Sequence, residues 1–94
     1  LENLASQIKE NCGVKILSSE RLVSRRNEVY AVLGMTPGQR LVKYVLKVCI
    51  NSSAEEESWW LTELRKYGLR VPEVKWHDSQ SILMEYIEGM LIAE

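Results

Sequence analysis

Lys47 is the residue of this sequence whose setting most needs a chemical explanation. It lies near the far end of an apolar run at residues 41–50, LVKYVLKVCI, which is too short to cross a membrane. A charged side chain inside such a run needs a carboxylate, a phosphate or open water around it. A carboxylate or a phosphate would make Lys47 part of a functional site.

The run 41–50 alternates as a β-strand does, so its side chains divide between two faces. One face carries Leu41, Lys43, Val45, Lys47 and Cys49, and its mixed character predicts a partly solvated cleft. The other face carries Val42, Tyr44, Leu46, Val48 and Ile50. We expect this second, almost wholly apolar face to pack against the helix predicted at 54–68. Lys43 lies close to a turn and is expected to be solvated.

Glu57 is the carboxylate best placed to receive Lys47. The predicted helix 54–68 has an apolar stripe made of Trp60, Leu61 and Leu64. Counting back three, four and seven residues from these positions leads to Glu57 each time, so its side chain lies at the buried edge of the helix. Glu55 and Glu56 point toward water. Trp59 lies on another row and is expected to be partly exposed or to cover an interface.

Each member of the proposed pair has a simpler alternative explanation. Lys47 could extend its ammonium group into solvent from an edge strand, and Glu57 could simply favour a helix N-terminus. Pairing them offsets the cost of burying both charges. Taken together with the resemblance described below, the two residues favour the pair.

Other reactive residue types in the chain carry less weight. His77 and Asp78 are adjacent, but they fall in a predicted turn between two short strands and are expected to have no catalytic role. Cys12 and Cys49 have neither metal-ligand nor redox spacing. Two reduced thiols, as in a cytoplasmic protein, are the expectation.

The elements that must position Lys47 and Glu57 can be predicted from periodicity and turn signals. We expect an N-terminal helix that ends near Asn11 and Gly13, then a strand at 14–17 and a polar connection at 18–27. A strand at 28–34, a type II turn at 35–39 and the strand 41–50 complete a meander. Polar caps at 51–53 start the helix 54–68, and strands at 71–77 and 81–87 follow, the last one ended by Gly89. The fold class is therefore α+β: one domain spanning residues 1–94, with a five-stranded antiparallel sheet packed against one main helix and an additional N-terminal helix.

Composition excludes several function classes. The chain has 94 residues, 46% of them hydrophobic, and a formal net charge of -1. Because Lys and Arg are scattered, no nucleic-acid partner is expected, and no apolar stretch is long enough to predict a membrane span. The N-terminus lacks a signal-peptide layout, which favours the cytoplasm. The chain starts at Leu1 rather than Met, so we expect a piece of a longer protein.

Four segments in order resemble a known family: YVLKV, the helix that carries Glu57, LRVPEV and ILMEYIEG. Together they look like the N-terminal lobe of the aminoglycoside phosphotransferase and choline kinase family, which has the protein-kinase-like fold. The resemblance covers residues 14–92. It implies that the chain ends just past the hinge between two lobes.

The resemblance assigns roles residue by residue. Lys47 is similar to the strand lysine that holds the α- and β-phosphates of a nucleotide, and Glu57 to the helix glutamate that orients it. The phosphate-covering loop corresponds to Ser24, Arg25, Arg26 and Asn27. The adenine pocket and hinge correspond to Val29, Val45, Met84, the carbonyl of Glu85 and the amide of Ile87. One departure is that this loop has no glycine, whereas protein kinases use a glycine-rich loop there.

The implied function is that of an ATP- or GTP-binding lobe of a phosphotransferase acting on a small-molecule hydroxyl group. The cofactors would be ATP or GTP with Mg²⁺, and the metal ligands, the catalytic residues and the acceptor site would belong to a second lobe. This chain is therefore not expected to catalyse the transfer alone. Two alternatives stay open: a pseudokinase-like regulator, and a non-catalytic protein-interaction module. The module would recognise a protein partner through an exposed apolar face around Met84, Ile87 and Met90, and a dimer is one outcome.

Overall fold

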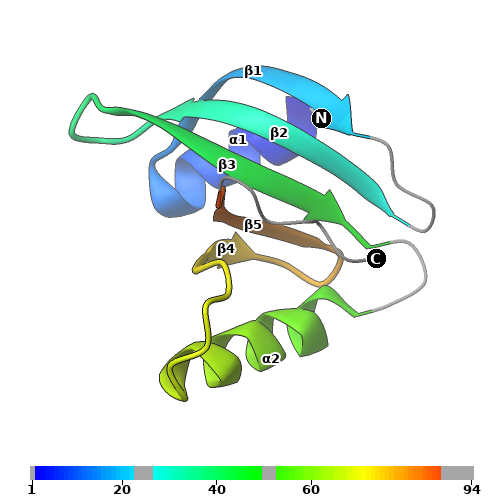
Figure 1. Cartoon of the computed structure of the whole chain (residues 1–94). Coiled ribbons are helices and arrows are strands. Elements are labelled where there is room, and N and C mark those ends of the chain that lie inside the picture. Colours follow the sequence, from blue (N-terminus) through cyan, green and yellow to red (C-terminus); the bar gives the residue numbers. More distant parts are fainter. Residues whose placement is uncertain (1, 23–26, 50–52, 88–94) are drawn as a thin grey trace.

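The computed structural model describes residues 2–22, 27–49 and 53–87, and Figure 1 shows its α+β architecture. A five-stranded antiparallel sheet and two helices confirm the predicted fold class. The elements in chain order are α1 (Glu2–Cys12), β1 (Lys15–Leu22), β2 (Glu28–Met35), β3 (Leu41–Val48), α2 (Ala54–Lys66), β4 (Val74–His77) and β5 (Ser81–Glu85).

Strand β3, which carries Lys47, lies at the centre of the sheet. The strand order is β1-β2-β3-β5-β4, and every neighbouring pair is antiparallel. Lys47 faces Val29 of β2 on one side and Ile82 of β5 on the other. An edge strand would have let the ammonium group reach solvent. The central position removes that explanation, so Lys47 needs a partner within the protein.

The sheet separates two cores, each covered by its own helix (Figure 1). The core on the α1 side consists of Ile8, Val14, Val32, Tyr44, Leu46 and Leu83. The core on the α2 side consists of Val29, Val45, Cys49, Ala54, Ile82 and Met84. Lys47 shares its face with the second core, because Val45 and Cys49 alternate with it along the chain.

The prediction that Val42, Tyr44 and Leu46 pack against the helix 54–68 is wrong. These side chains meet α1, whereas α2 covers the face that carries Val45 and Lys47. A core lies on each face of this sheet, so both faces of β3 are largely apolar. The alternation therefore separates the faces without showing which helix covers each one.

Helix α2 begins at the predicted residue and ends at Lys66, two residues before the predicted bound. Ser53 is its N-cap, and the Ser53 hydroxyl accepts a hydrogen bond of 3.3 Å from the backbone N–H of Glu56. Acidic residues fill the first turn and basic residues the last, which complements the helix dipole. Gly68 follows the C-cap with a φ of 83°, a left-handed conformation that glycine adopts without strain.

The buried row of α2 differs from the predicted stripe. Trp60 is 52% exposed, whereas Ala54 and Ser58 are buried and Leu61 is half-buried. A small side chain every turn lets the helix backbone approach the sheet closely, which leaves no room for an indole. Trp59 is also exposed, in line with its position on a different row.

Strand β1 extends further than predicted, because residues 18–22 belong to the strand rather than to a connection. Ser19 and Glu20 pair with Val32 and Ala31 of β2, although their side chains are exposed. An edge strand with solvent on its surface tolerates polar side chains, since the backbone ladder alone holds it. A register shift between Ile16 and Ser18 marks an irregularity in this strand. At the other edge, β4 and β5 are shorter than predicted, and Gly89 lies outside the described residues.

The hairpin between β2 and β3 does not contain the predicted type II turn. The N–H of Gln39 donates to the carbonyl of Thr36 at 2.9 Å, and Gln39, rather than Gly38, has a positive φ of 61°. A type II turn would place the positive φ at Gly38. A turn whose last residue is left-handed is typical of a three-residue hairpin loop. Here the loop consists of Pro37, Gly38 and Gln39.

Gly34 is required by packing, and its replacement by alanine is expected to destabilise the fold. A Cβ atom at Gly34 would lie 2.6 Å from Val14 Cγ1 and 2.9 Å from Tyr44 Cε2. Overpacking of this kind typically costs about 1–3 kcal/mol. Chemical denaturation should show the loss for Gly34→Ala, and little change for Gly38→Ala, where the nearest atom is 3.8 Å away. Equal stability of the two variants would contradict the close approach.

Candidate functional site

Lys47 and Glu57 form the central interaction of the candidate site. The ammonium group of Lys47 donates a 2.9 Å hydrogen bond to Glu57 Oε1, which joins the C-terminal end of β3 to the first turn of α2. The side chain of Lys47 is 7% exposed and that of Glu57 is 30% exposed. The predicted pair is thus confirmed. Its lysine is buried, and its carboxylate keeps one side toward solvent.

The small residues of α2 set the distance across which this pair can form, and sequence reasoning missed them. Ala54 is fully buried and Ser58 is 4% exposed, and they lie one turn apart on the side of α2 that faces the sheet. Glu57 lies beside Ser58, so a close approach of the helix brings its carboxylate to the sheet. The available signal was the spacing of two small residues at i and i+4.

Three side chains predicted for an adenine pocket lie on the same face as Lys47. Val29 is directly opposite Lys47, and Met84 is directly opposite Val45. The three are buried, at 1% exposure for Val29, 5% for Val45 and 7% for Met84. The structure thus brings together Lys47 and the predicted apolar wall, and it packs that wall into the core beneath α2.

The predicted phosphate-covering loop is described only at its end. Asn27 is 8% exposed and precedes β2, whose Val29 faces Lys47. Ser24, Arg25 and Arg26 lie outside the described residues. Asn27 is therefore the member of this loop that the structure places near the candidate site.

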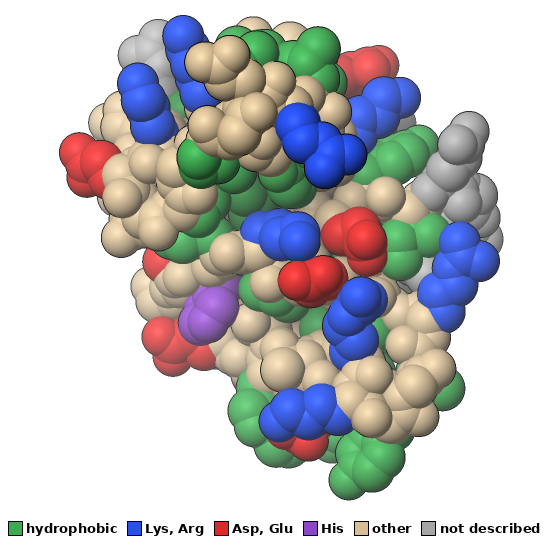
Figure 2. Space-filling model, turned by 90° about the vertical axis from the view of Figure 1, so that its left-hand side faces the viewer, with side chains coloured by type: hydrophobic (Ala, Val, Ile, Leu, Met, Phe, Trp, Pro, Cys, Tyr) green, Lys and Arg blue, Asp and Glu red, His purple; other side chains and the backbone are tan. Residues whose placement is uncertain are grey.

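The predicted hinge residues are tied to β4 and α2 by a cluster that the sequence did not predict. The Glu85 carboxylate accepts a 3.3 Å hydrogen bond from the backbone N–H of Glu73, and the N–H of Glu85 donates to the carbonyl of Glu73 at 2.9 Å. Arg65 of α2 lies 3.7 Å from the Glu85 carboxylate and 3.6 Å from that of Glu73. Figure 2 shows acidic and basic side chains side by side across this face. These contacts anchor the C-terminal turn of α2 to the end of β5.

An open hollow lies beside the predicted hinge. It encloses about 380 Å³ and is lined by Arg65, Arg70, Val71, Glu85, Tyr86 and Ile87. Ile87 is half-buried here, and Lys43 lies over the Tyr86 ring at 5.5 Å from the ring centroid. Met84 is buried, so it does not contribute to the exposed apolar face proposed for a dimer. Met90, the third residue of that face, lies outside the described residues.

Asp78 stabilises the turn between β4 and β5. Its carboxylate accepts hydrogen bonds from the N–H groups of Gln80 at 2.8 Å and Ser81 at 2.6 Å. The adjacent His77 is exposed at the end of β4. Cys12 lies on the α1 side of the sheet and Cys49 on the α2 side.

Within residues 2–22, 27–49 and 53–87, no group of His, Cys, Asp and Glu side chains could hold a metal ion. In the same residues, neither helix has the length and the apolar character needed to cross a membrane.

The residues present fit the phosphate end of a nucleotide better than its base. A lysine held by a glutamate is the arrangement that kinases use to grip α- and β-phosphates. An ammonium group has three N–H donors, and Glu57 accepts a hydrogen bond from one of them. In contrast, Val29, Val45 and Met84 are covered, so an adenine ring would contact them only after space opens beside them.

Comparison with known proteins agrees with this geometry. The sequence matches the RIO domain, an atypical protein-kinase-like domain, over residues 3–94. The curated proteins and the solved structures gave no match. The match supports the kinase-like N-terminal lobe, and it does not support the aminoglycoside phosphotransferase and choline kinase family. With its sheet, its two helices and the Lys47–Glu57 pair, this chain belongs to the RIO domain family.

Proposed function

We propose that this chain is the nucleotide-binding lobe of a RIO-family phosphotransferase, in which Lys47 grips the phosphates of ATP or GTP. The observation that carries the proposal is the 2.9 Å contact between Lys47 and Glu57 on the α2-covered face of the sheet. A purely structural ion pair gains little over apolar residues of the same size. A lysine retained in the middle of a sheet, with its own acid on the adjacent helix, is better explained by a phosphate ligand.

Glu57 acts in this proposal by holding Lys47 in one position. A lysine side chain has many rotamers, and its ordering costs up to about 2 kcal/mol. The salt bridge provides that ordering before the nucleotide arrives, so that the phosphate meets a fixed ammonium group. Mg²⁺, when bound, would offset the negative charge of the phosphates. We expect its ligands in a second lobe.

The base would lie against Val29, Val45 and Met84, with the backbone of Glu85 and Ile87 at its edge. The wall is closed in the structure, so adenine would bind only after the groups that cover Val29, Val45 and Met84 shift. We therefore expect the phosphate chain to supply most of the affinity of this lobe. The partners proposed are a nucleotide and an acceptor bound by a second lobe, in the cytoplasm. A small-molecule hydroxyl acceptor rests on motif resemblance alone.

Replacement of Lys47 tests the proposal. In isothermal titration with the 94-residue chain, Lys47→Met should weaken binding of MgATP by about 10- to 100-fold, because a hydrogen bond to a charged group contributes about 1.5–3 kcal/mol. Methionine keeps the length of the side chain and removes its charge, so the core should stay filled. Adenosine, which has no phosphate, should bind both proteins equally weakly.

The control is Lys43→Met, which is the same substitution four residues earlier on the same face of β3. Lys43 is exposed and lies beside Tyr86, so its replacement should change MgATP affinity less than twofold. Circular dichroism establishes that each variant is folded. Equal MgATP affinity for the wild type and Lys47→Met, or no binding by the wild type, would contradict the proposal.

A further inference from the structure

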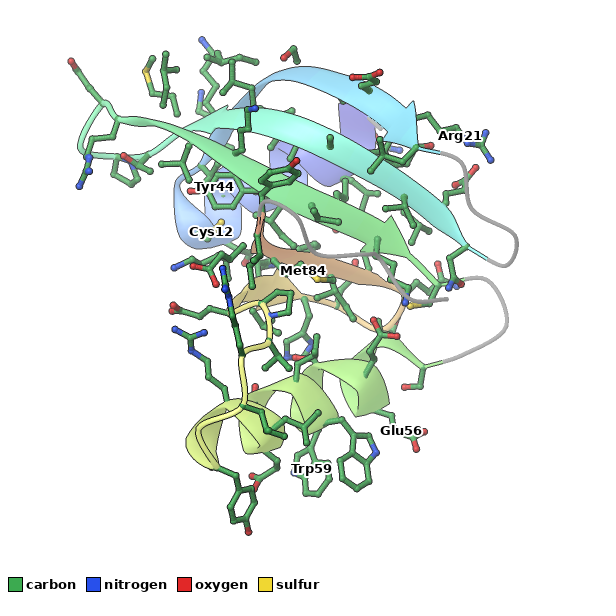
Figure 3. All side chains as sticks on the ribbon, in the orientation of Figure 1. Cys12, Arg21, Tyr44, Glu56, Trp59 and Met84 are labelled. Carbon is green, nitrogen blue, oxygen red and sulfur yellow. The ribbon has the colours of Figure 1, made fainter. Side chains whose placement is uncertain are left out.

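Two adjacent tryptophans on the outer side of α2 have no packing role within the described structure. Trp59 is 56% exposed and Trp60 is 52% exposed, and their rings meet edge to face with centroids 4.9 Å apart. Figure 3 shows Trp59 directed away from the sheet, on the far side of the helix from the core. The buried side of α2 belongs instead to Ala54 and Ser58. The indole pair therefore presents apolar surface to solvent.

Two glutamates flank the indole pair and complete what we call the acidic–aromatic patch: Glu55, Glu56, Trp59 and Trp60. Glu55 lies four residues before Trp59, and Glu56 lies four before Trp60, so each carboxylate is a helical neighbour of one indole. Figure 3 shows Glu56 pointing outward like Trp59. The helix dipole accounts for acidic residues in a first turn, but it does not account for two exposed indoles.

The charge of this patch is not balanced by its surroundings. Glu57 is paired with Lys47, and Glu63 is paired with Lys66. In contrast, neither Glu55 nor Glu56 takes part in an ion pair within the described residues, and both are exposed. The patch thus combines a negative field with aromatic faces, which is the complement of a cation on a flexible chain.

We propose that the acidic–aromatic patch docks a segment of a partner protein rich in arginine or lysine. A guanidinium group would stack on an indole while a neighbouring carboxylate pairs with its charge, and such aromatic residues are typical anchors of interfaces. The like charge of Glu55 and Glu56 disfavours phosphate-bearing partners such as nucleic acids and anionic membranes. This site lies on the opposite side of α2 from Lys47 and does not depend on nucleotide binding.

The test uses a fluorescein-labelled nine-residue peptide of alternating arginine and glycine, titrated with the whole chain at low ionic strength. We expect saturable binding, followed by fluorescence anisotropy. Trp59→Ala combined with Trp60→Ala should weaken it by about tenfold or more, as loss of an anchor does. Glu55→Gln combined with Glu56→Gln should weaken it by about fivefold and remove most of its salt dependence.

Two controls separate docking from general charge attraction. Tyr67→Ala removes an aromatic ring that is 81% exposed at the other end of α2, and it should leave the affinity unchanged. A peptide with citrulline in place of arginine keeps the planar group without its charge and should lose about tenfold in affinity. Circular dichroism should show all variants folded, since the replaced side chains are exposed.

Three outcomes would overturn the proposal. The first is the absence of saturable binding to the wild type, and the second is binding that the tryptophan variant leaves intact. The third is a dimer, seen by sedimentation velocity and lost in the tryptophan variant, that the arginine peptide does not compete with. That last result would assign the patch to a second copy of this chain.

Discussion

Replacement of Glu57 by alanine should lower the free energy of unfolding by about 3 kcal/mol. Removing one partner of a buried ion pair leaves the other charge buried without compensation, which costs about 3–5 kcal/mol. The lower end of that range applies because the Glu57 side chain is 30% exposed, whereas that of Lys47 is 7% exposed. Urea denaturation followed by circular dichroism gives the change, with the slope of the transition held as a check on two-state behaviour.

Two further variants separate the pair from other effects of the substitution. Glu56→Ala removes a neighbouring acid from the same helical turn, and it should cost less than about 1 kcal/mol through the helix dipole. Lys47→Met combined with Glu57→Ala removes both charges, and it should recover most of the stability lost by Glu57→Ala alone. A double variant no more stable than Glu57→Ala would show that the burial of Lys47 is not what Glu57 compensates.

The Lys47–Glu57 pair could be predicted because each residue obeys a simple period. Alternation along β3 places Lys47 on one face of a strand, the helical repeat places Glu57 on the row of Leu61 and Leu64, and the resemblance to a kinase-like lobe favours their pairing. None of these steps needs knowledge of the tertiary structure. The structure then joins the two side chains at 2.9 Å.

The helix that covers each face of β3 could not be predicted from the same pattern. Strand β3 is apolar on both faces because a core lies on each side of the sheet, so Leu46 and Val45 look alike in the sequence although they belong to different cores. The choice depends on the path of the chain after β3 and on the strand order, which places β5 between β3 and β4. These are long-range properties that local periodicity does not contain.

The buried row of α2 was misjudged because hydrophobicity was used without size. Trp60 is more apolar than Ser58, yet Ser58 is buried and Trp60 is half-exposed. Close packing of a helix on a sheet selects small residues where the backbones approach, and volume then decides which side chain fits. The ion cluster around Arg65 was missed for a related reason, since its members come from α2, β5 and the segment before β4.

The sequence predicted the kinase-like lobe correctly but the wrong family within that fold. The segments that carry Lys47, Glu57 and Glu85 follow the kinase-like order, and this order is what the match to the RIO domain supports. The same segments pointed to the aminoglycoside phosphotransferase and choline kinase family, which the match does not support. Residues that position a nucleotide are shared among kinase-like folds, so they identify the lobe more readily than the family.

A cavity made in one core should destabilise the helix that covers that core more than the other helix. Two adjacent residues of β5 allow one such cavity to be made in each core. Ile82 and Leu83 are both fully buried, but Ile82 belongs to the α2 core and Leu83 to the α1 core. Either Ile82→Ala or Leu83→Ala should cost about 2–5 kcal/mol. That is a large part of the roughly 5–15 kcal/mol available to a domain, so the measurements need a temperature well below the unfolding midpoint.

Native-state hydrogen exchange should show which helix each cavity releases. Ile82→Ala should lower the protection of amides in Ala54–Lys66 more than in Glu2–Cys12, and Leu83→Ala should do the reverse, because each helix packs on a different side of the sheet. Loosening of α2 would also separate Glu57 from Lys47, which lies directly opposite Ile82. Equal loss of protection in both helices for both variants would mean that the cores open as one unit. In that event, the Lys47–Glu57 contact would depend on the global stability of the domain rather than on the local packing of α2 against the sheet.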